Sequence, residues 1–153
     1  MVQNVSGYEH TARQGTLGEP APSVVVVGLA SFAALQLALA LVMVLSPHRF
    51  FVAVGPFGAF NAHYIRDVAS FYSALGGGLL IAIRRVSWRV PVLAIATLQY
   101  GLHSLNHLLD IANAHPPWTG YFDFATLALA TALLAGLWRT AARDYPRAGG
   151  GAR

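Results

Sequence analysis

The chain contains no cysteine and no lysine. Without thiols it can form no disulfide, bind no metal or iron–sulfur cluster through thiolates, and use no cysteine nucleophile. Charge is also scarce, since charged residues make up 10% of the 153 residues, against roughly 25% in an average soluble chain. Hydrophobic residues make up 56% and mean hydropathy is +0.52. This balance excludes a disordered chain, argues against a water-soluble globule and predicts a one-domain integral membrane protein.

Four apolar segments are each long enough to cross the bilayer core, about 30 Å thick, as a helix. They are residues 24–45, 61–83, 90–112 and 121–138, the last being the shortest. Only helices and closed barrels satisfy their backbone in lipid, so we predict an all-α, four-helix transmembrane bundle over residues 24–138. Residues 1–23 read as a flexible tail whose Ser23 caps the first helix, and residues 139–153 as a basic tail.

Arginine positions predict the orientation of the bundle. Eight of the ten basic residues fall in the N-terminal tail, the connection between the second and third spans, and the C-terminal tail, which four spans place on one side. They are Arg13, then Arg84, Arg85 and Arg89, then Arg139, Arg143, Arg147 and Arg153. The positive-inside rule makes this side the cytoplasm, with both termini inside a bacterial cytoplasmic membrane. Since topology accounts for the basic charge, no nucleic-acid partner is expected.

Polar residues gather in the outer half of the predicted spans. On the second span they are Asn61, His63, Arg66, Asp67 and Ser70; on the third they are His103, Asn106, His107 and Asp110, with Gln99 near mid-depth; and Asp123 opens the fourth. The spacing i, i+4, i+7 puts each main set on one helix stripe. A polar group facing lipid would be unpaired, so we predict that the two stripes face each other inside the bundle.

This constellation is compatible with a metal site. His103 and His107 share a helix face with Asp110, and His63 adds a ligand from the second span. Such a nitrogen and oxygen set suits zinc, copper or iron. Haem held between His63 and His103 or His107 is less favoured, because the bundle must also leave room for the porphyrin. The alternative is a network, including Asn61, Gln99, Asn106 and Asp123, that only joins helices by hydrogen bonds.

Catalysis on a lipid-soluble molecule is a further hypothesis. His63 and Asp67 have the spacing of a general-base pair, and Arg66 can hold the anionic head group of a lipid-like substrate. The alternative for Arg66 is an ion pair with an aspartate. Transmembrane ion conduction is disfavoured because the inner half of the spans is apolar, so a pocket open to the outer side fits better.

Small residues recur every four positions on the second and fourth spans. These rows are Ala69, Ser73 and Gly77, and Ala128, Ala132 and Gly136. Such rows let helix backbones approach closely in lipid. They predict close packing within the bundle or a homo-oligomer.

The polar motifs resemble those of the DoxX-like proteins, small bacterial four-helix membrane proteins. The likeness rests on Phe57-Gly58-x-x-Asn61-x-His63-x-x-Arg66-Asp67 and on His103-x-x-Asn106-His107-x-x-Asp110. It spans roughly residues 24–138. It implies a four-helix bundle and permits a redox or lipid-linked role, but it assigns no functional residue to this chain.

We therefore expect a small membrane protein whose outer-half His/Asp/Arg site binds a metal or a small amphipathic ligand, such as a quinone or a lipid-like molecule. The alternative is an accessory subunit whose polar residues only lock the helices together or receive a partner.

Overall fold

The computed structural model describes residues 23–144, which form an all-α chain. The elements in order are α1 (Val24–Leu45), α2 (Pro47–Ala53), α3 (Ala62–Arg84), α4 (Val86–Leu109), the 3-10 turn η1 (Ile111–Asn113) and α5 (Pro117–Asp144). The predicted all-α class is confirmed. The predicted tails over residues 1–22 and 145–153 lie outside the described residues.

The first helix has the bounds that its sequence predicts. The Ser23 side chain accepts a hydrogen bond from the Val26 amide at 3.3 Å, as an N-cap does. Ser46 and Pro47 end the helix, and Pro47 then opens α2, where its missing N–H is tolerated. The short helix α2 was not predicted from the sequence.

The last helix is much longer than predicted. Instead of residues 121–138 it covers 28 residues, and it includes Arg139 and Arg143. Residues 139–144 are therefore helix and not the start of a tail. Arginine is a good helix former, so the charges that end the apolar run do not end the helix. At the same end of the bundle, a single residue, Arg85, separates α3 from α4.

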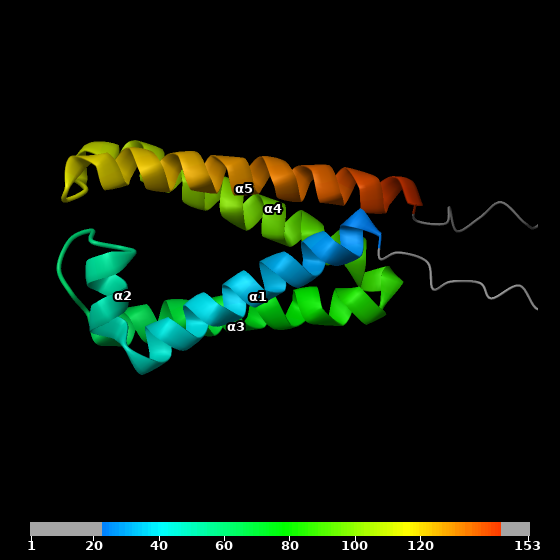
Figure 1. Ribbon diagram of the computed structural model, residues 1–153, viewed down its shortest axis with the longest axis horizontal. Helices are drawn as coiled ribbons and strands as arrows, with labels where there is room; N and C mark the ends of the chain where they lie inside the picture. Colours follow the sequence, from blue (N-terminus) through cyan, green and yellow to red (C-terminus); the bar gives the residue numbers. More distant parts are fainter. Residues whose placement is uncertain (1–22, 145–153) are drawn as a thin grey trace, which may run out of the picture.

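The long helices associate in two pairs, α1 with α3 and α4 with α5 (Figure 1). Each pair is antiparallel. Gly76 allows a close approach within the first pair, because a Cβ there would lie 2.8 Å from Cγ of Leu37 on α1. In Figure 1 the pairs approach each other where α1 begins and diverge toward α2. We call these regions the closed end and the open end.

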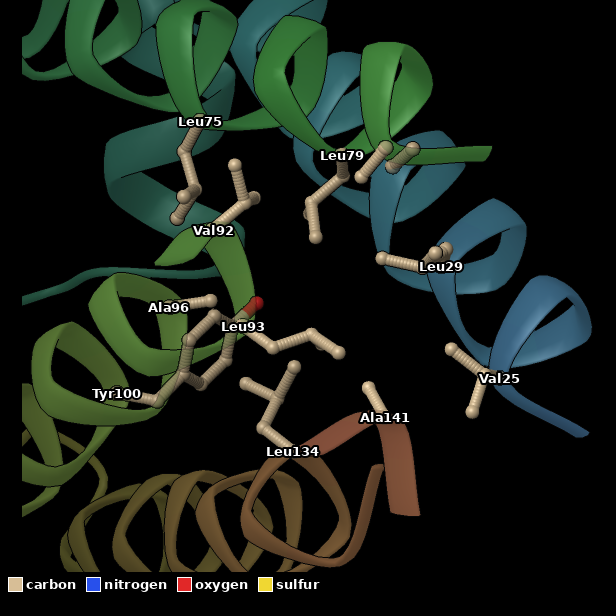
Figure 2. Close-up of a cluster of buried hydrophobic side chains, with 12 residues drawn as sticks. Val25, Leu29, Leu75, Leu79, Val92, Leu93, Ala96, Tyr100, Leu134 and Ala141 are labelled. Carbon is tan, nitrogen blue, oxygen red and sulfur yellow. The ribbon is translucent and has the colours of Figure 1, made fainter. Parts of the chain in front are cut away.

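The closed end has a core to which all four long helices contribute. Leu29, Leu79, Leu93 and Leu134 each come from a different helix, and none is more than 1% exposed (Figure 2). The second cluster lies toward the open end and joins only α1, α3 and rings from α2. Its buried members are Ala40, Met43, Ile65 and Ala69. The two pairs therefore share a core at one end only.

Two helices, α1 and α5, are long and apolar enough to cross a membrane. Only 28% of the apolar window of α1 and 11% of that of α5 is buried, so neither is a core helix wrapped by the rest of the described chain. Large apolar side chains such as Leu41, Ile95 and Leu129 point outward, each at least 58% exposed. A water-soluble monomer rarely leaves so much apolar surface uncovered.

Candidate functional site: a cavity at the open end

A cavity of about 470 Å³ lies between the two helix pairs at the open end. One wall comes from α1, α2 and α3, and the other from α4 and α5. Most of the lining is apolar, including Leu35, Leu39, Met43, Phe50, Phe51, Val68, Leu127 and Ala130. Leu35, Tyr64 and Phe122 line it and are also exposed, so the cavity opens to the surface of the protein.

Two histidines and an aspartate bring polar chemistry into this apolar space. His103 and His107 lie one turn apart on α4, with ring centroids 4.8 Å apart in an edge-to-face arrangement. On the same wall, Oδ2 of Asp123 on α5 lies 4.0 Å from Nδ1 of His107. Both atoms are buried, and neither has a hydrogen-bond partner among the described residues. A gap of 4.0 Å is too long for a direct hydrogen bond, so the hydrogen-bonding capacity of both atoms is unsatisfied in the described chain.

The connection between α2 and α3 holds one of these histidines in place. The Phe57 ring packs edge-on against the His107 ring, with centroids 4.9 Å apart and planes at 90°. Gly58 follows with φ +66°, a conformation that side chains other than glycine's rarely adopt. This turn therefore returns the chain to α3 just after Phe57 has reached the cavity.

The polar stripe of α3 does not face the cavity, contrary to the prediction. His63 and Asp67 form an i, i+4 pair at 3.4 Å, with side chains 88% and 64% exposed. Arg66 and Ser70 are exposed as well. The reason is that α3 turns its apolar stripe, including Ile65 and Ala69, toward α1 and so carries the polar residues outward. None of the predicted catalytic residues His63, Arg66 and Asp67 lines the cavity.

The residues predicted as metal ligands are divided in the same way. Within residues 23–144, no three His, Asp or Glu side chains lie close enough together to hold a metal ion. His103 and His107 line the cavity, whereas His63 does not. Asp110 is exposed at the end of α4, where its carboxylate accepts a hydrogen bond from Asn113 at 3.0 Å. The structure therefore does not gather His63, His103, His107 and Asp110, and it does not bring His63 opposite either histidine of α4 as haem ligation requires.

The predicted polar network is only partly assembled. Asn61 lines the cavity and caps α3 by accepting a hydrogen bond from the Tyr64 amide at 3.1 Å. Asn106 is exposed. The buried Oε1 of Gln99 has no hydrogen-bond partner in the described part of the chain. Gln36 on α1 is fully buried, and both of its side-chain amide atoms also lack a partner there. Of the predicted set, only Asp123 lies opposite a histidine.

Sequence reasoning missed the tyrosines of the cavity wall. Tyr72 and Tyr100 line it from opposite pairs, and the Tyr100 ring packs edge-on against Phe32 at 5.8 Å. Helical spacing could have predicted the position of Tyr100, because Tyr100, His103 and His107 fall at i, i+3 and i+7 on one face of α4. Asp123, Thr126 and Leu127 share a face of α5 in the same way.

Comparison of the chain with protein-family models, curated proteins and solved structures gives no match. The resemblance to DoxX-like proteins therefore stays a prediction.

Proposed function

We propose that this chain is a four-span protein of the bacterial cytoplasmic membrane whose open-end cavity binds a small amphipathic ligand. The span hypothesis extends beyond α1 and α5 because α3 and α4 have 23 and 24 residues. At 1.5 Å per residue, each is about 35 Å long, enough for a hydrocarbon core of about 30 Å. Their polar residues lower their mean hydropathy but lie mainly toward the open end.

The arginines support an orientation with the closed end in the cytoplasm. Arg84, Arg85, Arg89, Arg139 and Arg143 all lie at or near the closed end of the helices. Arg49 and Arg66 are the arginines at the other end within the described residues. In this orientation the cavity lies in the outer half of the bilayer.

The cavity itself carries the ligand hypothesis. A volume of about 470 Å³ falls within the range of small-molecule pockets, roughly 300–1,000 Å³. Such pockets are mostly apolar and have a few polar groups that orient the ligand. Here the apolar walls suit a hydrocarbon portion, and His103, His107 and Asp123 suit a polar head.

The absence of cysteine makes the topology directly testable. Single cysteines replacing Ser87, beside the α3–α4 connection, and Ala112, in η1, would stand at opposite ends of the bundle. We expect a membrane-impermeant maleimide to label Ala112→Cys in right-side-out vesicles and Ser87→Cys only in inside-out vesicles. Labelling of both variants from the same side would overturn the four-span topology.

Ligand binding is tested by extracting the detergent-purified protein with organic solvent and identifying the extract by mass spectrometry. We expect a stoichiometric amphiphile with the wild type and His63→Ala, and its loss with His107→Ala. Leu39→Trp, which fills the cavity and leaves both histidines in place, should also lose the amphiphile. Folded variants are confirmed by circular dichroism. If all four proteins carry the same lipids in the same amounts, the cavity is not a binding site, and an accessory role becomes the better account.

A further inference from the structure

The polar end of the cavity holds two side-chain atoms, unpaired among the described residues, that can serve as a hydrogen-bond donor and an acceptor. Nδ1 of His107 and Oδ2 of Asp123 lie 4.0 Å apart, and both are buried without a hydrogen-bond partner in the described chain. An oxygen atom about 2.8 Å from each would satisfy both atoms once a side-chain rotation of His107 or Asp123 admits it, since hydrogen bonds of this kind are about 2.7–3.0 Å long. A hydroxyl group can accept from the imidazole N–H and donate to the carboxylate at once.

We propose, on the basis of the binding function above, that the ligand is an uncharged amphiphile whose hydroxyl group bridges His107 and Asp123. The bridge satisfies two buried polar atoms that otherwise lack partners among the described residues. An unsatisfied buried polar group is expensive, so a ligand that supplies both partners gains affinity from each contact. An ether or ester oxygen can only accept, and it would leave Asp123 unpaired.

The charge of the lining argues against an anionic head group. No arginine lines the cavity, and Asp123 is the one carboxylate in its lining as the structure describes it. A phosphate or fatty-acid carboxylate would be placed beside Asp123 and would be repelled by it. A cationic amine would pair with Asp123 but would compete with the N–H of His107, because an ammonium group has no acceptor.

The rest of the lining suits an alkyl or isoprenoid chain. Leu39, Met43 and Val68 form one apolar wall, and Leu127 and Ala130 form the other. Leu35 lines the cavity and is 46% exposed, so the chain can leave the cavity toward the outer surface of the helices. In a bilayer that surface meets the lipid tails, from which such a ligand enters without crossing water.

The test uses full-length protein in detergent and four probes with the same sixteen-carbon chain: the alcohol, its methyl ether, the carboxylate and the primary amine. Affinities are measured by competition against the radiolabelled alcohol. We expect the wild type to prefer the alcohol over the ether about tenfold, which corresponds to one hydrogen bond to a charged group. The carboxylate and the amine should bind at least as weakly as the ether.

The variants separate a bridging role from a merely structural one. In Asp123→Ala the preference for alcohol over ether should fall to about one, while ether binding stays within about twofold of the wild type. His107→Ala should weaken the alcohol about tenfold. Asp67→Asn and His63→Ala, which change the exposed pair on α3, should alter neither value.

The outcomes are distinct. Equal affinity of wild type for alcohol and ether, or tighter binding of the carboxylate or the amine, would overturn the hydroxyl bridge and leave the amphiphile site standing. Failure of every probe to bind, together with an extract free of amphiphile, would overturn the proposed function as well.

Discussion

The two ends of the bundle are built from the same four helices and packed in opposite ways. At the closed end, leucines from all four helices meet in one core that excludes solvent. At the open end, the apolar residues of α1, α2 and α3 pack among themselves, and α4 and α5 stand apart across a cavity. His107 on α4 and Asp123 on α5 line this cavity, and their facing atoms are 4.0 Å apart. The difference teaches that one set of helices can form a closed core at one end and border a cavity with polar groups at the other.

Leucine truncation should expose this difference most strongly. Leu93 is fully buried in the closed-end core, so Leu93→Ala should lower the free energy of unfolding by about 2–4 kcal/mol. Leu39→Ala removes the same atoms from the cavity wall and should cost about 1 kcal/mol, because one side of Leu39 already lacks packing partners. Unfolding with SDS in mixed micelles measures both. Equal losses would contradict the division into two ends.

Two glycines of α5, Gly120 and Gly136, should differ in how well they tolerate substitution by alanine, because Gly120 packs against η1 at the open end. A Cβ on Gly120 would overlap the backbone carbonyl oxygen of Ile111, which cannot rotate away. Gly120→Ala should therefore destabilise the protein by about 1–3 kcal/mol. A Cβ on Gly136 would meet no described atom within 4 Å, so Gly136→Ala should be neutral or stabilise by up to about 1 kcal/mol. Thermal unfolding in detergent compares the stability of the two variants. If Gly120→Ala is as stable as the wild type, the backbone of η1 can shift to make room for the added Cβ.

Arg89 should contribute to the closed end through the α3–α4 connection. Its Nε donates to the Ala82 carbonyl at 3.2 Å and its Nη2 to the Ile83 carbonyl at 3.3 Å, which satisfies oxygens at the end of α3. Arg89→Ala should cost about 1 kcal/mol. The neighbouring Arg85 is exposed and makes no such side-chain bond in the described chain, so Arg85→Ala is the matched control. If Arg89→Ala and Arg85→Ala lower the unfolding midpoint equally, the effect comes from the lost charge and not from the hydrogen bonds of Arg89.

The exposed pair on α3 should matter least to stability. His63→Ala removes a contact with Asp67 in which the two side chains are 88% and 64% exposed, and the loss should be below about 0.5 kcal/mol. The same unfolding assay checks this value. A larger loss would indicate that the outward-facing stripe of α3 is covered, for example by a second copy of the chain.

Local signals in the sequence were enough to predict most helices. Ser23 was predicted correctly as the start of α1 because capping acts on neighbouring backbone groups. The limits of α5 were wrong because arginines mark the edge of an apolar run, not the end of a helix. The short α2 escaped prediction because its seven residues are too few to show a helical period.

The candidate site was only half predictable, for a different reason. Periodicity groups His103 with His107 and His63 with Asp67, but it cannot say which way each helix is turned. That rotation is decided by packing between helices, where Ile65 and Ala69 of α3 meet α1. The outcome placed His107 opposite Asp123, a residue 16 positions away on the next helix, and left His63 outside.

The single-residue connection at Arg85 has a consequence for biosynthesis. Each helix pair is a continuous stretch of chain, residues 24–84 and then 86–144. The first pair can therefore complete its own contacts while the second is still on the ribosome, in keeping with the N-terminal-first order of folding during synthesis. The closed-end core forms only when the second pair arrives, and the cavity, bounded by both pairs, is the last part of the molecule to come into existence.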